Sequence, residues 1–108
     1  MTDGLYQLLA ARARGKCECC GEPLGFGFAA PTVDHFLGRA KAEETEFLCW
    51  VLRADHHRAK TDNSPSAAYW IDKFLKHCSK YVGDGYREAA YQAQKKLDWL
   101  TARKGVLP

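Results

Sequence analysis

Residues 47–61, Phe-Leu-Cys-Trp-Val-Leu-Arg-Ala-Asp-His-His-Arg-Ala-Lys-Thr, decide the fold expected for this chain. Their first six residues form an apolar run rich in strand-forming side chains and bounded by charge on both sides, which predicts a strand over 47–52. A short helix over 56–61 is expected to follow. The segment 28–36, which ends in Thr-Val-Asp-His-Phe, is the expected partner strand, and Pro31 is expected to delay its start. Together these segments predict a two-stranded antiparallel hairpin followed by a helix.

Helical patterns flank this centre on both sides. Residues 2–14 read as a helix that Thr2 caps and Gly15 ends. After Asp-Asn-Ser-Pro at 62–65, with Ser64 as the expected cap, the next helix carries an apolar stripe at helical spacing: Ala67, Trp70, Ile71, Phe74, Cys78 and Tyr81. A last helix over 86–104 has a buried side of small and apolar residues: Ala89, Ala90, Ala93, Leu97 and Leu100.

The expected fold class is therefore α+β and mostly helical. A ββα core at about 16–62 is wrapped by flanking helices, the C-terminal ones at about 65–104. The chain of 108 residues is expected to form one domain, 1–108. The absence of a long apolar run and of an N-terminal signal pattern predicts a cytoplasmic protein, in a bacterium or a phage-infected cell, that does not cross a membrane.

Net charge and cysteine content bear on the kind of partner and on the compartment of the protein. The net charge of +3 is compatible with a polyanionic partner but decides little alone. Five cysteines, three of them within residues 17–20, argue against a disulfide framework. They favour a reducing compartment and a metal-binding knuckle, the turn-rich segment 16–27.

Cys17-x-x-Cys20-Gly21 is the first motif that carries chemistry. Two thiolates at this spacing can bind one tetrahedral zinc from a tight turn. The alternatives are a redox pair, whose usual strand–helix context is missing here, and unliganded buried cysteines. Cys19, between the two ligands, is expected to face away from the metal.

Asp34-His35 at the end of the first strand is the second motif. A carboxylate that holds a hard cation, beside an imidazole that takes a proton from water, is what phosphodiester hydrolysis needs. The alternative for Asp34-His35 is a pair of turn or cap residues.

His56 and His57 form the third motif. Neighbours on a helix point about 100° apart, so one can face the knuckle while the other faces Asp34. The alternative for His56-His57 is a solvated basic helix end.

Taken in order, Cys-x-x-Cys-Gly, Val-Asp-His-x-x-x-Arg-x-Lys and His-His-x-x-Lys-Thr resemble the HNH endonuclease family over about residues 16–62. The resemblance implies a ββα-metal centre in which His35 is the general base. Asp34 and His57 would hold the catalytic divalent cation, Mg²⁺ or Mn²⁺, with Ni²⁺ or Zn²⁺ tolerated. It also places basic residues near the nucleic acid: Arg39, Lys41, Arg58 and Lys60.

The chain departs from the family pattern at its second pair of zinc ligands. His56 takes one position, whereas the other holds Arg53, which stays protonated and cannot bind zinc. Cys49, four residues earlier, is the expected substitute. Cys78 as the fourth ligand, or a knuckle without metal, are the alternatives.

The middle Asn of the family pattern is also missing. It aligns with Leu48, and Glu46 or a backbone group is expected to orient the base instead.

The function expected from this resemblance is metal-dependent hydrolysis of DNA, by nicking or double-strand cleavage. A monomer or a homodimer could act, and such a domain would suit a phage, a mobile element or a defence system. The alternatives are a non-catalytic, zinc-stapled nucleic-acid-binding or adaptor domain and, more remotely, a redox protein.

Overall fold

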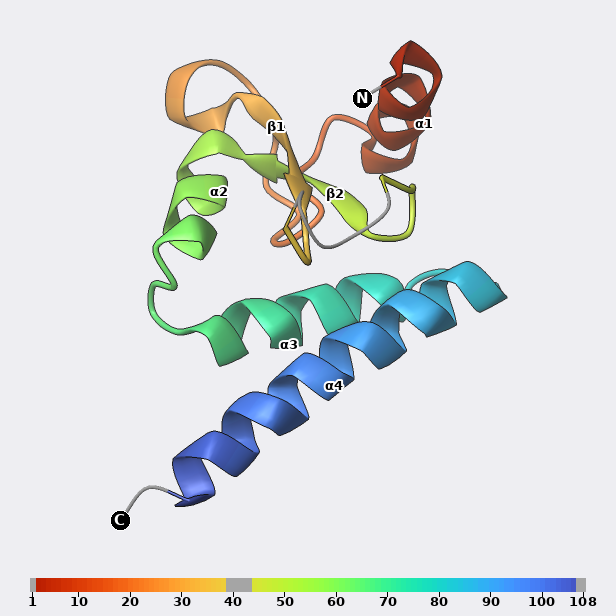
Figure 1. Cartoon of the computed structure of the whole chain (residues 1–108). Helices are drawn as coiled ribbons and strands as arrows, with labels where there is room; N and C mark the ends of the chain where they lie inside the picture. The colour runs from red at the N-terminus through yellow and green to blue at the C-terminus, as the bar shows by residue number, and fades with distance from the viewer. Residues whose placement is uncertain (1, 39–43, 107–108) are drawn as a thin grey trace.

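The computed structural model describes residues 2–38 and 44–106. In this part of the chain, strands β1 (Pro31–His35) and β2 (Cys49–Arg53) pair antiparallel, and helix α2 (Ala54–Thr61) follows β2 directly. The expected α+β fold, with a hairpin and helix at its centre and longer helices around it, is confirmed (Figure 1).

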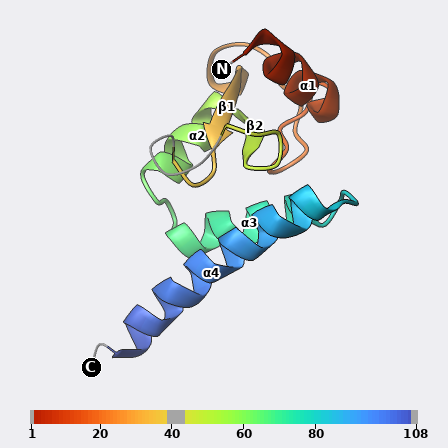
Figure 2. The same cartoon turned by 45° about the vertical axis from the view of Figure 1, so that its right-hand side comes forward.

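The hairpin lies between helices that cover its two faces. Helix α1 (Asp3–Ala13) lies on one side, and α3 (Ala67–Cys78) with α4 (Asp84–Val106) on the other (Figures 1 and 2). Because side chains alternate along a strand, successive residues of β2 serve different cores. Cys49 and Val51 pack with α1, whereas Trp50 and Leu52 belong to the larger cluster under α3 and α4.

Two helix starts follow local capping. The hydroxyl of Thr2 accepts a hydrogen bond from the Leu5 amide at 3.2 Å, as predicted for the first helix. The predicted cap of the third helix was wrong, because Ser66 rather than Ser64 accepts from the Tyr69 amide. The Ser64 amide donates to the Ala59 carbonyl, so Ser64 still belongs to the turn that ends α2.

Strand β1 starts late, at Pro31, as predicted, whereas β2 begins two residues later than predicted. Residues before β1 form a 3₁₀ turn, η1 (Gly27–Ala29), which begins at a glycine with φ of 61° and thereby delays the strand to Pro31. Before β2, the Leu48 amide donates to the Thr45 hydroxyl in a turn, so pairing begins at Cys49.

A buried ion pair ties α1 to the knuckle and to β2. Arg12 donates from Nε and Nη2 to the two carboxylate oxygens of Glu18, both at 2.8 Å. Arg12 also donates to the Cys49 carbonyl, and Glu18 accepts from the Val51 amide at 3.0 Å. This network was not predicted from the sequence, and it fixes residues 17–20 against the second strand.

Within residues 2–38 and 44–106, no helix combines the length and the apolar character that crossing a membrane requires.

Candidate functional site

Asp34 is the buried centre of the site. It lies opposite Trp50 in the hairpin, and the indole Nε1 donates to its Oδ2 at 2.7 Å. The Lys60 ammonium, on α2, lies 3.1 Å from Oδ2 and 3.3 Å from Oδ1. Oδ2 therefore accepts from Trp50, whereas Oδ1 accepts from Lys60; a carboxylate oxygen has two lone pairs, so Oδ1 keeps capacity for one further partner.

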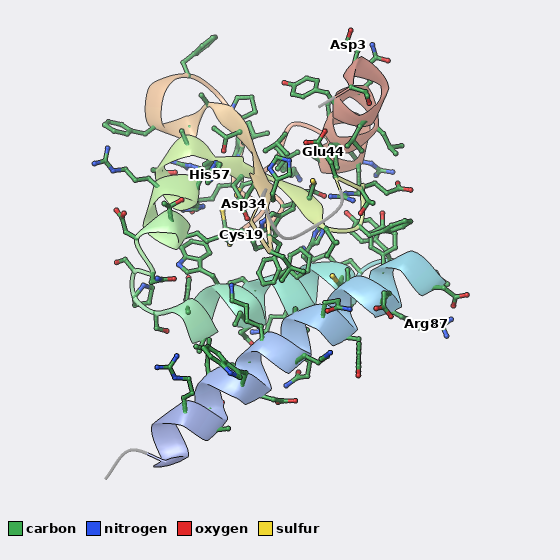
Figure 3. The ribbon with its side chains drawn as sticks, viewed as in Figure 1. Asp3, Cys19, Asp34, Glu44, His57 and Arg87 are labelled. Atoms are coloured by element: carbon green, nitrogen blue, oxygen red, sulfur yellow. The ribbon has the colours of Figure 1, made fainter. Side chains whose placement is uncertain are left out.

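His57 faces that oxygen from the first turns of α2. Its Nε2 lies 3.4 Å from Asp34 Oδ1, and its Nδ1 lies 2.9 Å from the hydroxyl of Thr32 (Figure 3). His56 points away from this pair and toward the knuckle. The two histidines therefore face different sites, as the angle between helix neighbours predicts.

The spacing of these two donor atoms fits a shared divalent cation. Two ligands bound at about 2.1 Å to one ion stand about 3.0–3.4 Å apart when the angle at the ion is about 90–110°. The observed 3.4 Å between His57 Nε2 and Asp34 Oδ1 lies at the upper end of that range. A carboxylate oxygen and an imidazole nitrogen suit Mg²⁺, Mn²⁺ or Zn²⁺.

His35, the next residue along β1, is held by a carboxylate. Its Nε2 lies 2.8 Å from Oε2 of Glu44, and this hydrogen bond lowers the pKa of the Glu44 carboxyl group. An ionised carboxylate only accepts hydrogen bonds, so Nε2 is the donor. In the neutral ring, Nδ1 then carries the lone pair.

These side chains border one open hollow. Its volume is about 450 Å³, and it is lined by Val33, Asp34, His35, Gly38 and His57. The hollow therefore brings the candidate base and both candidate cation ligands to a surface that is wide enough for a phosphodiester.

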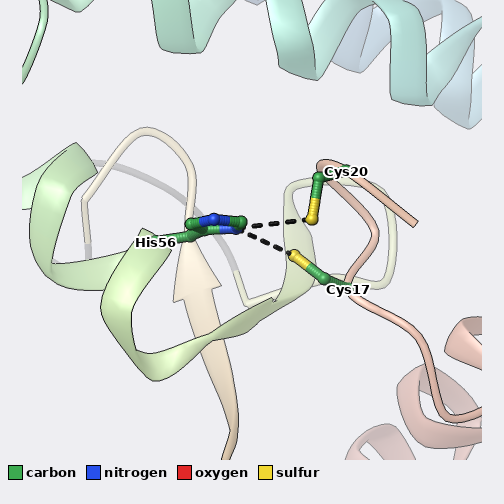
Figure 4. Close-up of side chains that lie close together, drawn as sticks. All are labelled: Cys17, Cys20 and His56. Carbon is green, nitrogen blue, oxygen red and sulfur yellow. Dashed lines mark hydrogen bonds between the residues drawn. The ribbon is translucent and has the colours of Figure 1, made fainter. Parts of the chain in front are cut away.

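A second group of ligands lies on the other side of α2. The Sγ atoms of Cys17 and Cys20 are each 3.5 Å from Nδ1 of His56, and the three ligand atoms lie within 4.8 Å of one another (Figure 4). A zinc ion bound at about 2.3 Å to sulfur and about 2.0 Å to nitrogen would separate the two by about 3.5 Å in a tetrahedron. This cluster could hold a metal ion such as zinc.

Cys49 does not join that cluster, contrary to expectation. It is fully buried against Leu9 and Ala13 of α1, whereas Cys17 packs with Trp50 and Leu52 in the other core. The strand alternation separates them, since residues 49 and 50 point to opposite faces. Cys49 is thus a core residue, and burial raises the pKa of its thiol to about 11.

The remaining cysteines also lie outside the metal group of the described residues. Burial, followed by the neighbouring Cys17 and Cys20, raises the pKa of Cys19 to about 12. Cys78 is buried in the apolar face of α3, where desolvation raises its pKa to about 11. Both thiols therefore stay protonated near neutral pH.

Arg53, at a position where the HNH pattern has a zinc ligand, forms ion pairs instead. Its guanidinium pairs with Asp55 at 3.0 Å and with Glu22 of the knuckle. Its backbone amide donates to Cys17 Sγ at 3.5 Å. Charge pairing and this amide–sulfur bond hold Cys17 and Glu22 to the start of α2.

The predicted nucleic-acid contacts have different surroundings. Lys60 is committed to Asp34 and is mostly buried, so its ammonium neutralises the carboxylate rather than extending into solvent. Arg58, on the same helix, is exposed. Arg39 and Lys41 lie outside the described residues.

Three site residues were missed by the sequence reasoning. Trp50 was treated as a strand former only, Thr32 had no role, and Glu46 or a backbone group, rather than Glu44, was expected to orient His35. The hairpin register would have found Trp50, because it pairs residue 34 with residue 50. No local signal in the sequence singles out Glu44.

Comparison with protein-family models, with curated proteins and with solved structures gives no match to this chain.

Proposed function

We propose that this chain is an HNH-type endonuclease that hydrolyses DNA phosphodiester bonds with the help of a divalent cation. The observation that carries the proposal is the convergence of Asp34 Oδ1 and His57 Nε2 at 3.4 Å, with His35 lining the same hollow. The ordered motifs of the sequence independently resemble that family. Both lines point to the same three side chains.

His35 acts as the general base in this proposal. With its Nε2 proton donated to Glu44, the lone pair on Nδ1 can accept a proton from a water molecule. The imidazolium that results is stabilised by the Glu44 carboxylate at 2.8 Å. Glu44 thereby does for the base what the missing Asn would have done.

Asp34 and His57 hold the cation. When bound, the cation stabilises the negative charge that builds on the scissile phosphate and on the leaving oxygen. Trp50 donates to Oδ2 of Asp34, and the Lys60 ammonium lies close to both carboxylate oxygens; together they fix the carboxylate with Oδ1 toward His57. The oxygen–nitrogen donor pair favours Mg²⁺ or Mn²⁺ and tolerates Ni²⁺ or Zn²⁺.

The Cys17–Cys20–His56 group holds a structural zinc in this proposal. His56 and His57 are consecutive, so fixing His56 to the knuckle also fixes the orientation of α2 that presents His57. The described residues supply three ligands of the four that a closed zinc site takes.

The exposed Arg58 is the described basic side chain best placed on α2 to contact a phosphate. Such a contact positions DNA without reading its sequence.

Cleavage of supercoiled plasmid with Mg²⁺ or Mn²⁺ tests the proposal. Wild-type protein should nick or linearise the plasmid, and His35→Ala should be slower by about 10²–10⁴-fold. Asp34→Asn should be inactive. Asp72→Asn, the same change at an exposed position of α3, should keep full activity and serves as the control.

The alternative functions give different results. DNA binding without cleavage in any of the ions would favour the non-catalytic nucleic-acid-binding domain. Neither binding nor cleavage would overturn the proposal, and undiminished cleavage by His35→Ala would move the base elsewhere.

A further inference from the structure

Thr32 occupies the position in the hairpin from which one hydroxyl can bridge a strand and a helix. It pairs with Leu52 across the sheet, and its Oγ1 donates to the Leu52 carbonyl at 2.9 Å. The same oxygen lies 2.9 Å from Nδ1 of His57 on α2. Thr32 and Asp34 are two residues apart, so they share a face of β1, and each of them contacts one ring nitrogen of His57.

The proton on this hydroxyl determines the proton on the imidazole. A carbonyl oxygen can only accept, so the single Thr32 proton is committed to Leu52. The hydroxyl can then only accept from His57, which requires a proton on Nδ1. In the neutral ring, Nε2 is left with a lone pair that faces Asp34 Oδ1 at 3.4 Å.

We infer that Thr32 is a positioning residue that holds His57 in the Nδ1–H tautomer and thereby selects Nε2 as its cation ligand. Without the hydroxyl, Nε2 would carry the proton and donate it to Asp34, closing the pair to a cation. The role in cation binding rests on the proposed function, whereas the tautomer is a property of the protein alone. Hydrogen bonds of this kind to a ligand histidine fix its ring and its basicity.

Long-range ¹⁵N–¹H NMR of labelled protein measures the tautomer directly. The protein is used as purified, without added Mg²⁺ or Mn²⁺, at pH 8. Signals of His57 are those lost in His57→Gln. Wild type and Thr32→Ser should show Nδ1–H, and the near-isosteric Thr32→Val should shift toward Nε2–H.

Thr61→Val is the matched control. Thr61 also donates its hydroxyl proton to a backbone carbonyl, that of His57, at 3.0 Å. Among the described residues, its hydroxyl has no hydrogen bond to an imidazole nitrogen. The control should keep the wild-type tautomer. A titration with Mn²⁺ alone should show affinity about 10–100-fold weaker in Thr32→Val and near wild type in Thr32→Ser and Thr61→Val.

The outcomes separate the two proposals. Nε2–H in the wild type, or Nδ1–H retained in a folded Thr32→Val, overturns the inference. A shifted tautomer with unchanged Mn²⁺ affinity overturns the selection of Nε2. If the tautomer is as expected but the wild type binds no Mn²⁺ and cuts no plasmid, the role of Thr32 on the tautomer stands and the proposed nuclease function fails.

Discussion

Trp50 and Asp34 face each other across the hairpin, and the indole Nε1 donates a 2.7 Å hydrogen bond to the carboxylate. Trp50 is completely buried and Asp34 nearly so. A hydrogen bond to a charged, buried acceptor is among the stronger ones in proteins. One side chain thus belongs both to the core and to the candidate cation site.

Trp50→Phe should therefore weaken both folding and cation binding. Loss of the bond to the charged carboxylate should lower the free energy of unfolding by about 1.5–3 kcal/mol, measured by urea denaturation, and Mn²⁺ affinity should fall. Trp70→Phe is the control, because Trp70 donates to a neutral carbonyl, that of Ser64, at 2.9 Å. It should cost about 0.5–1.5 kcal/mol and leave Mn²⁺ affinity unchanged. Equal effects of the two substitutions on Mn²⁺ affinity would contradict this role of Trp50.

Zinc content should distinguish the cysteines. Elemental analysis should find about one zinc per chain in the wild type and in Cys49→Ser, because Cys49 lies in the α1 core. Cys17→Ser and Cys20→Ser should lose the zinc and melt at lower temperature, since structural zinc contributes folding free energy. Loss of zinc in Cys49→Ser would show that Cys49 is a zinc ligand after all. A folded wild type without zinc would show that the knuckle binds no metal.

Arg12→Met should be strongly destabilising. It would leave the Glu18 carboxylate buried without its bidentate partner, and removing one member of a buried pair costs about 3–5 kcal/mol. Arg14→Met is the same change at an exposed residue two positions later, and it should stay within about 0.5 kcal/mol of wild type. Chemical denaturation of both proteins measures the difference. Similar unfolding free energies would show that the Arg12–Glu18 pair contributes little.

His77 should make stability depend on pH. Burial lowers its pKa to about 4, although Glu18, 3.8 Å from Nδ1, acts in the opposite direction. An unfolded histidine has a pKa of about 6.5, so between pH 6.5 and 4 the unfolded chain binds a proton that the folded chain does not. The contribution of neutral His77 to the free energy of unfolding is therefore complete above about pH 6.5. It falls by about 3 kcal/mol as the pH is lowered to 4.

Replacing His77 isolates this contribution. Neither ring nitrogen has a hydrogen-bond partner among the described residues, and the ring packs against Trp50 and Phe74. His77→Phe should keep the fold and flatten the decline of unfolding free energy between pH 6.5 and 4, as measured by urea denaturation at several pH values. The other histidines are present in both proteins, so parallel curves would refute the assignment to His77.

The sequence by itself determined the local features of this protein. Thr2 caps its helix because a hydroxyl reaches an amide three residues away, and the stripe of α3 follows from helical periodicity. The same holds for the separation of His56 from His57, which the angle between helix neighbours requires. Each of these depends on spacing within a few residues, which the sequence contains.

Tertiary structure alone decided which side chains complete the site. Trp50 reaches Asp34 because of the strand register, Thr32 reaches His57 because α2 packs beside β1, and Glu44 reaches His35 from nine residues away. Cys49 was assigned to the knuckle on chain proximity, but the face it occupies depends on how the hairpin packs between α1 and α3. A shift of one residue in register exchanges the two faces of a strand, and that register is set by contacts across the molecule rather than by neighbours in the chain.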